Sequence, residues 1–165
     1  MQIPIRKAGK YAHLKPDPHL TETKFNQLKS RLEKLKTMQP PAIAEVKRLA
    51  EMGDFSDNAA YSIAKGRLRG LNQRILELED HLKRAVIIIP GKNSGVVMLG
   101  SRVTLATAGR QKSYKILGSS ETDPQAGIIS HLSALGSALI GRRVGDKISV
   151  KTINKKIEYT LIKIE

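Results

Sequence analysis

Apolar residues in the first half of the chain recur at spacings of three and four, which is the pattern of helices that bury one narrow face. In one segment they fall at Phe25, Leu28, Leu32, Leu35, Ile43, Val46 and Leu49. In the next they fall at Ala64, Leu68, Leu71, Ile75, Leu78, Leu82 and Ala85. Each face is too narrow to be covered by anything except a similar helix. The two segments are therefore predicted to pair as an antiparallel helical hairpin.

Turn residues set the expected limits of the two helices. The first is predicted to begin near Glu22 and to reach Met38, where Pro40-Pro41 predicts a kink or break before the helix resumes. The second is predicted over residues 58–83, which gives a length of roughly 40 Å at 1.5 Å per residue. Such a hairpin carries its turn far from the rest of the protein.

The second half has a different pattern, with short apolar or β-branched runs separated by glycine and proline turns. It predicts one short helix at 133–140 and strands at 102–106, 113–117, 127–131, 147–152 and 157–164. The change falls at the loop 91–95. We therefore predict an α+β chain in three parts: a basic extended arm (1–20), a coiled-coil hairpin (21–90) and a small antiparallel β domain with one short helix (91–165).

Composition adds a preference for polyanionic partners. The 165 residues include 29 basic and 15 acidic side chains, a formal net charge of +14. With two Phe, four Tyr and no Trp, attraction to phosphate is favoured over stacking on bases. The absence of cysteine excludes disulfides and thiolate metal sites. No stretch is apolar enough to span a membrane, so we expect a cytoplasmic protein. We also expect it to be monomeric.

Residues 53–61, Gly-Asp-Phe-Ser-Asp-Asn-Ala-Ala-Tyr, lie between the two predicted helices and carry two carboxylates. Spacing alone favours a structural explanation, because Gly53 suits the end of one helix and Ser56, Asp57 or Asn58 suits the cap of the next. The alternative is that Asp54 and Asp57 form a catalytic or metal-binding pair.

This nine-residue segment resembles the hairpin tip of the bacterial Gre transcript-cleavage factors, GreA and GreB, whose usual form is Gly-Asp-x-x-Glu-Asn-Ala-Glu/Asp-Tyr. Residues 65–69, Lys-Gly-Arg-Leu-Arg, are similar to the basic run that follows the tip in GreB. Residues 114–123 and 138–142 also resemble family segments in the same order. The resemblance covers about residues 20–165 and implies an FKBP-like fold for the second half.

The resemblance also implies a function. Gre factors insert the hairpin into the secondary channel of a backtracked RNA polymerase, which then hydrolyses its own transcript. Asp54 and Asp57 match the tip carboxylates that help to hold a catalytic Mg²⁺ and position the attacking water. The ion is supplied in the polymerase active centre, so we expect the isolated protein to bind none tightly and not to be an enzyme itself.

Two further groups of candidate residues follow from the resemblance. Exposed cations after the tip are expected to bind the 3′ segment of the nascent RNA, unless they are merely a solvated helix face: Lys65, Arg67, Arg69 and Arg74. A docking element for the polymerase is expected where the family has Asp/Asn-Ser-Pro, at Leu132, Ser133 and Ala134, together with Leu139 and Ile140.

The tip departs from the family pattern at two positions. Asp57 is one methylene shorter than the family glutamate, and Ala60 replaces a third acid. These departures leave open a Gre-like protein that occupies the channel and pauses or inhibits polymerase without cleavage. A basic coiled-coil protein that simply binds nucleic acid is the second alternative. His13 and His19 in the arm have no neighbouring acid or cysteine cluster to suggest a metal site.

Overall fold

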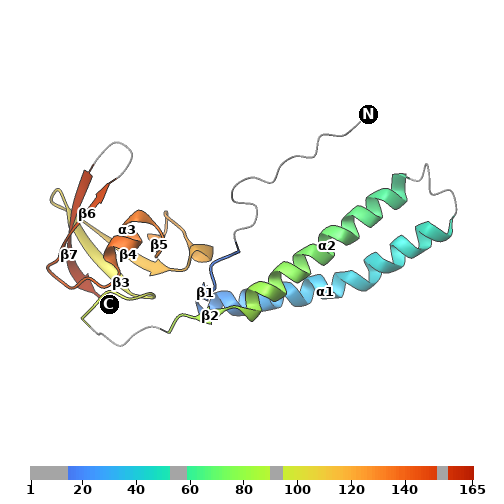
Figure 1. Cartoon of the computed structure of the whole chain (residues 1–165), viewed down its shortest axis with the longest axis horizontal. Helices are drawn as coiled ribbons and strands as arrows, with labels where there is room; N and C mark the ends of the chain where they lie inside the picture. The colour runs from blue at the N-terminus through green and yellow to red at the C-terminus, as the bar shows by residue number, and fades with distance from the viewer. Residues whose placement is uncertain (1–14, 53–58, 90–94, 152–155) are drawn as a thin grey trace.

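The computed structural model describes residues 15–52, 59–89, 95–151 and 156–165, and Figure 1 shows an elongated molecule with two unlike ends. One end is the hairpin of helix α1 (Glu22–Glu51) and helix α2 (Ala59–Lys83). The other is a compact β domain. Among the described residues, no helix is both long enough and apolar enough to cross a bilayer.

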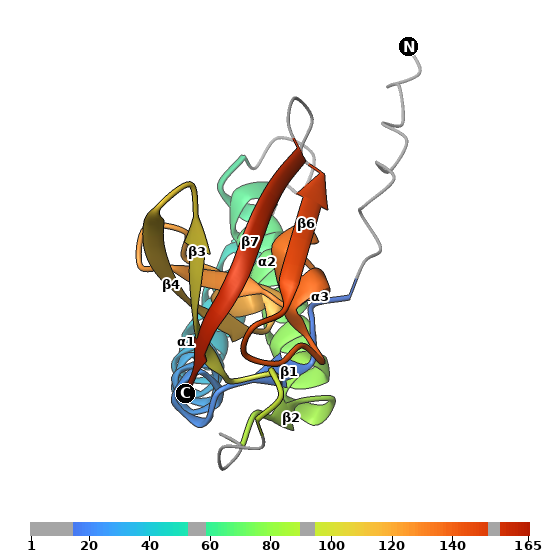
Figure 2. The same ribbon diagram turned by 90° about the vertical axis from the view of Figure 1, so that its left-hand side faces the viewer.

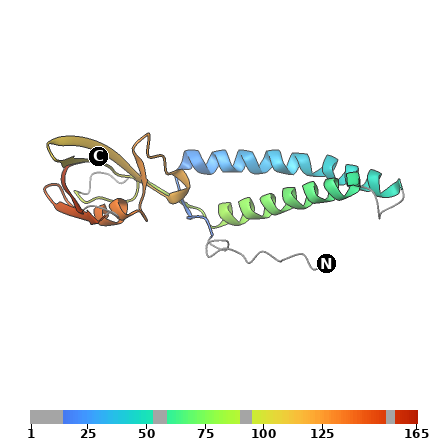
Figure 3. The same cartoon turned by 90° about the horizontal axis from the view of Figure 1, so that it is seen from above.

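Helices α1 and α2 lie side by side and antiparallel along their length, as predicted (Figures 1 and 3). Leu32, Leu49 and Ile75 are buried between them, and most other positions of the predicted apolar faces are half-buried. Ile43 is an exception, because 49% of it is exposed. After the prolines, the buried face of α1 passes through Ala42 and Val46 instead.

The predicted break at the prolines is wrong, because α1 runs continuously through Pro40 and Pro41. Each proline removes one backbone donor from the helix. Contacts across the hairpin in the turn before the prolines offset this loss: Gln39 Nε2 donates to Asn72 Oδ1 at 2.8 Å, and Lys36 pairs with Glu79 at 2.8 Å. At its start the helix is capped by Thr21, whose Oγ1 accepts from the Lys24 N–H.

A five-stranded curled sheet in the order β5-β4-β3-β7-β6 forms the second domain (Figure 2). Its strands are β3 (Arg102–Thr107), β4 (Arg110–Leu117), β5 (Ile128–Ser130), β6 (Lys147–Lys151) and β7 (Lys156–Ile164). All neighbours are antiparallel except β4 and β5, which are parallel. Helix α3 (Ala134–Leu139) closes a core of Val97, Val103, Leu105, Ile116, Leu139, Ile148, Val150 and Leu161. The predicted α+β fold is confirmed.

The base of the hairpin is closed by a two-stranded ribbon that the sequence did not predict. Strand β1 (His19–Leu20) pairs in parallel with β2 (Val86–Ile87), and Leu20 is fully buried. The short 3-10 helix η1 (Ser119–Glu121) of the β domain lies against this ribbon. Gly118 approaches it so closely that an added Cβ would lie 2.0 Å from the His19 carbonyl oxygen. The division into an arm, a hairpin and a β domain stays a prediction, but residues 15–20 are held at the junction.

Candidate functional site

The two candidate tip acids, Asp54 and Asp57, lie outside the described residues. Helix α1 ends at Glu51 and α2 begins at Ala59, both at the end of the hairpin farthest from the β domain (Figure 1). The segment that joins them contains both acids. The first turn of α2 carries no acidic residue, so its described part adds no carboxylate to the pair.

The four candidate RNA-binding cations are all exposed on α2; Lys65, Arg67 and Arg69 lie on the half of the helix nearer the tip, and Arg74 lies just past its middle. Helical periodicity divides them between two faces, because Lys65 and Arg69 are four residues apart and Arg67 and Arg74 are seven apart. None of the four makes a salt bridge to another described residue. Lys65 Nζ lies 5.7 Å from the centre of the Tyr61 ring. Their charge is therefore available to a partner.

Lys65 and Arg69 border a shallow hollow on the outer side of α2. Its lining also includes Ser62, Gly66, Leu68, Asn72, Gln73 and Leu76. At Gly66 and Gly70 no heavy atom lies within 4 Å of where a Cβ would stand, so the helix backbone is open to solvent there. An extended polyanion could approach the helix closely at this point.

Acidic side chains nearer the base of α2 are already engaged. Glu79 pairs with Lys36, Asp80 pairs with Arg84 at 2.9 Å, and Glu77 accepts from Gln73 at 2.8 Å. The hydrogen bond from Arg84 holds the pKa of Asp80 below its ordinary value. The charge of α2 is thus polarised, with unpaired cations towards the tip and ion-paired or hydrogen-bonded acids towards the base.

The five candidate docking residues cluster around helix α3 but differ in exposure. Ser133 caps the helix, since its Oγ accepts from the Gly136 N–H at 3.0 Å and donates to the Ser130 carbonyl at 2.7 Å. Leu132 is 68% exposed and Ile140 is 39% exposed, and Ala134 is exposed as well. Leu139 is fully buried in the core. It can contribute only by holding α3 in place, whereas Leu132, Ala134 and Ile140 present a surface.

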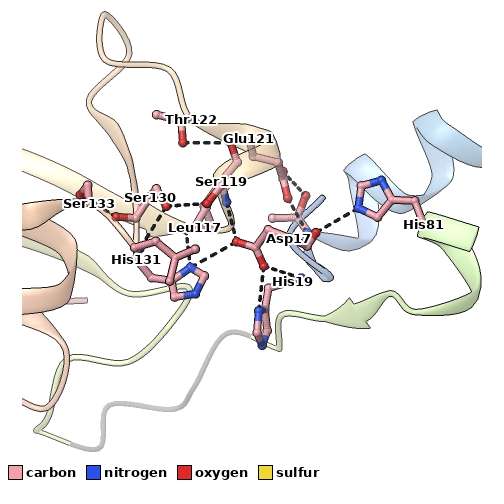
Figure 4. A network of polar contacts seen from close by, with 12 residues as sticks. Asp17, His19, His81, Leu117, Ser119, Glu121, Thr122, Ser130, His131 and Ser133 are labelled. Carbon is pink, nitrogen blue, oxygen red and sulfur yellow. Dashed lines mark hydrogen bonds and ion pairs between the residues drawn. The ribbon is translucent and has the colours of Figure 1, made fainter. Parts of the chain in front are cut away.

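Sequence reasoning missed the junction between the hairpin and the β domain, which Figure 4 shows from close by. Glu121 accepts two hydrogen bonds from Thr21, from its backbone N–H at 2.7 Å and from its hydroxyl at 2.6 Å. The Asp17 carboxylate accepts from the Ser119 N–H at 2.7 Å and from the His19 N–H at 3.0 Å. His81, buried at the base of α2, lies 2.9 Å from the Asp17 carbonyl oxygen.

These contacts set the charge state of Asp17. Burial by itself raises the pKa of this carboxyl, but the N–H donors of Ser119 and His19 outweigh that effect and hold the pKa below its ordinary value. The only sequence signal for this role was an acid between two prolines, Pro16-Asp17-Pro18. Its partner Ser119 lies 102 residues away in the chain, so no local pattern could identify this contact.

Comparison with known proteins matches both halves of the chain. The family described as "Transcription elongation factor, N-terminal" matches residues 19–87, and "Transcription elongation factor, GreA/GreB, C-term" matches residues 92–165. The hairpin and the β domain therefore match the N-terminal and C-terminal parts of the same protein family.

Individual proteins are similar to this chain over most of its length. The chain is 38% identical over 138 residues to transcription elongation factor GreA of Macrococcus caseolyticus, which covers 82% of this chain and 87% of the relative. It is 34% identical over 148 residues to GreA of a Nitratiruptor species, which covers 88% and 91%. A crystal structure of GreA factor homolog 1 from Thermus thermophilus is 32% identical and covers 90% of this chain and 99% of that one, with a TM-score of 0.41. The GreB-like character of the basic run stays a prediction. This chain belongs to the GreA/GreB family of transcription elongation factors.

Proposed function

We propose that this protein binds RNA polymerase, inserts its hairpin into the secondary channel and stimulates cleavage of backtracked RNA by the polymerase. The observation that supports this most is the position of the Gly53–Tyr61 motif. It joins the far ends of α1 and α2, which are 30 and 25 residues long. At 1.5 Å per residue, these helices hold the motif roughly 40 Å from the base of the hairpin.

The donor chemistry of the tip fits Mg²⁺, because carboxylate oxygens are the hard ligands this ion prefers. Asp54 and Asp57 would hold it, and the ion would lower the pKa of a bound water and stabilise developing negative charge during hydrolysis. The first turn of α2 supplies no further acid. Two carboxylates are too few for a tight site of their own, so the ion belongs to the polymerase active centre and the isolated chain is not a nuclease.

The chain's own contribution is therefore positioning. The paired helices fix the direction from which Asp54 and Asp57 approach, and a carboxylate held at the reacting centre needs no further ordering when the reaction occurs. The two acids orient the attacking water and accept its hydrogen bonds. The hairpin fills the channel, and hydrolysis remains the work of the polymerase.

Cations on α2 guide the extruded RNA. Lys65 and Arg69 on one face and Arg67 and Arg74 on another have no described acidic partner, so phosphates can be bound without breaking an ion pair. We assign the 3′ segment to the Lys65/Arg69 face, where Gly66 lines the hollow and leaves the helix backbone open, and the channel wall to the Arg67/Arg74 face.

Docking to the outside of the polymerase is assigned to the surface of α3 formed by Leu132, Ala134 and Ile140. Leu132 precedes α3 and Ile140 follows it, and exposed apolar side chains of this kind favour contact with another protein. The protein acts as a monomer in this scheme, since a single hairpin fills the channel.

Conservative substitutions at the tip test the proposal. Asp54→Asn and Asp57→Asn each keep the side-chain shape and remove the negative charge, so each should slow RNA cleavage in backtracked complexes by at least about 100-fold while polymerase affinity changes less than about threefold. Glu51→Gln is the matched control, because Glu51 is an exposed acid at the end of α1 outside the motif. Equal cleavage by all three variants would overturn the assigned role of the acids.

Occupation of the channel without cleavage is the second candidate, and it is favoured by two features of the tip. Asp57 reaches one methylene less far than a glutamate, and Ala60 offers no carboxylate. In that case the wild-type protein would slow nucleotide addition and leave the cleavage rate at its intrinsic value. Asp57→Glu separates the two functions, since longer reach should speed cleavage only if the tip is already catalytic.

A further inference from the structure

Two histidines from opposite sides of the junction point their Nδ1 atoms at one buried carboxylate (Figure 4). His19 Nδ1 lies 2.9 Å from Asp17 Oδ1, and His131 Nδ1 lies 3.5 Å from Asp17 Oδ2. The two rings meet edge to face with their centres 5.3 Å apart. One ligand atom from each of the three residues lies within 4.8 Å of the other two.

Hydrogen bonding alone accounts poorly for the position of His131. Its Nδ1 has two acceptors, Asp17 Oδ2 at 3.5 Å and the Leu117 carbonyl at 3.4 Å. Both distances are at the outer limit for a nitrogen donor, whose usual range is about 2.7–3.2 Å. The ring is nevertheless directed at the carboxylate, so the geometry leaves a gap between donor and acceptors.

That gap suits a metal ion. Ligand atoms about 2.0–2.1 Å from a tetrahedral ion are separated from one another by about 3.3 Å. His131 Nδ1 lies 3.5 Å from Asp17 Oδ2, close to this value, and His19 Nδ1 lies 2.9 Å from the other carboxylate oxygen, Oδ1. The three ligand atoms lie within 4.8 Å of one another, so rotation of the two rings has to bring them closer together around the ion.

The surroundings of Asp17 hold its carboxylate in a fixed orientation, as is usual for a metal ligand. Its side chain is only 3% exposed, and the backbone N–H groups of Ser119 and His19 fix both oxygens. His19 and His131 are more accessible, at 37% and 20%. They border an open hollow through which an ion and a water ligand can enter, together with Lys15, Arg84, Ser119 and Leu132. A rigid acid with two adjustable imidazoles is a donor set that favours a first-row transition ion over Mg²⁺.

We propose that Asp17, His19 and His131 form a binding site for a divalent transition ion of the Zn²⁺ type, which fastens the hairpin to the β domain. Each imidazole binds through the Nδ1 lone pair and carries its proton on Nε2. Two ligands belong to the segment that leads into α1 and the third follows β5, so the ion bridges parts of the chain more than 100 residues apart. It therefore limits rotation of the hairpin relative to the domain, and with it the direction in which the tip points.

The site is tested on the full-length protein without polymerase. Calorimetric titration with ZnCl₂ should show one ion bound per chain, and Co²⁺ should give the intense visible absorption of a tetrahedral site with nitrogen ligands. MgCl₂ should give no heat at the same concentrations. Zn²⁺ should also raise the melting temperature and slow amide exchange at Ser119 and His19, because a ligand that binds only the folded junction stabilises it.

Three variants assign the ligands. His19→Gln and His131→Gln should each weaken Zn²⁺ binding by at least about tenfold and abolish the Co²⁺ absorption. His19 is partly exposed, so its replacement leaves the fold intact even if that of His131 does not. His13→Gln is the matched control, a histidine six residues away that is not one of the three ligands, and it should bind Zn²⁺ like wild type. Absence of Zn²⁺ binding by the folded wild type, or unchanged binding by His19→Gln, would overturn the proposal.

Discussion

The hairpin and the β domain are stabilised in different ways. The domain closes around eight buried apolar side chains that come from four strands (β3, β4, β6 and β7), α3 and the segment before β3. The hairpin buries only three apolar side chains between its helices, Leu32, Leu49 and Ile75. Most of its surface is exposed, and no third element covers it among the described residues. Its stability therefore depends on a narrow seam and on the junction at its base.

This difference matches what each part has to do. A hairpin that enters a channel has to be thin. Its buried apolar interface therefore cannot be enlarged by packing further elements against it, because these would also make the hairpin wider. The β domain has no such limit and can anchor the base. We expect amide exchange to be slowest in β3, β4 and β7, faster in the middle of the helices and fastest towards the tip.

The largest effect is expected in the domain core. Leu161 is fully buried on β7, which lies between β3 and β6 in the sheet, so Leu161→Ala should lower the free energy of unfolding of the domain by about 3–5 kcal/mol. Chemical denaturation followed by amide exchange resolves the two regions. If the hairpin lost protection to the same extent, the two regions would be one cooperative unit and the comparison would fail.

A smaller loss is expected in the hairpin seam. Ile75→Ala should destabilise the hairpin by about 2–3 kcal/mol, because two helices without further cover can close partly over the lost volume. Ile43→Ala is the matched control. Its side chain is half exposed on the same hairpin, so its replacement should cost less than about 0.5 kcal/mol. Equal losses would place Ile43 in the seam after all.

The junction should contribute less again. Glu121→Gln removes the charge that accepts both the N–H and the hydroxyl of Thr21, and a loss of about 1–2 kcal/mol is expected. The loss should appear as faster exchange in the first turn of α1 and in β1. Glu158→Gln, which removes an exposed charge on β7 with only a 4.0 Å ion pair, should change neither. A similar effect from both variants would mean that net charge, and not the junction, is responsible.

The smallest effect is a gain. Gly66→Ala and Gly70→Ala should each stabilise α2 by about 0.5–1 kcal/mol, since alanine has the higher helix propensity and a Cβ would meet no atom within 4 Å at either site. Thermal unfolding followed by circular dichroism measures it. If RNA uses the Lys65/Arg69 face as proposed, Gly66→Ala should also weaken crosslinking to the RNA 3′ segment, whereas Gly70→Ala, between Arg67 and Arg74 on the other face, should not. A stabilised hairpin with unchanged crosslinking would move the RNA to the Arg67/Arg74 face.

The two regions also differed in how much the sequence revealed. Repeated apolar spacing located both helices, because a coiled-coil face is a local pattern; α2 was predicted to end at Lys83 and does so. The same spacing wrongly placed Ile43 on the buried face of α1. The periodicity was continued through the prolines, although the buried face shifts there to Ala42 and Val46. The strands of the domain were found to within about three residues from their turns.

The junction could not be predicted in the same way. Asp17, Glu121 and His131 are brought together by the fold, and none belongs to a periodic pattern. The pairing of β1 with β2 joins two segments of two residues each, too short to be recognised from composition. The acids of the tip were found from their motif, and their role stays a prediction because they lie outside the described residues.

The central claim is tested most directly by measuring RNA cleavage in a defined backtracked complex with its polymerase, with and without the wild-type protein, at saturating concentration and in the presence of Mg²⁺. The rate of nucleotide addition is measured in parallel on an active complex. A cleavage factor should release the 3′ fragment at least about tenfold faster than the polymerase alone and return the complex to elongation. Binding accompanied by an unchanged cleavage rate and slower nucleotide addition would contradict the proposed function and assign the protein to the channel-blocking alternative.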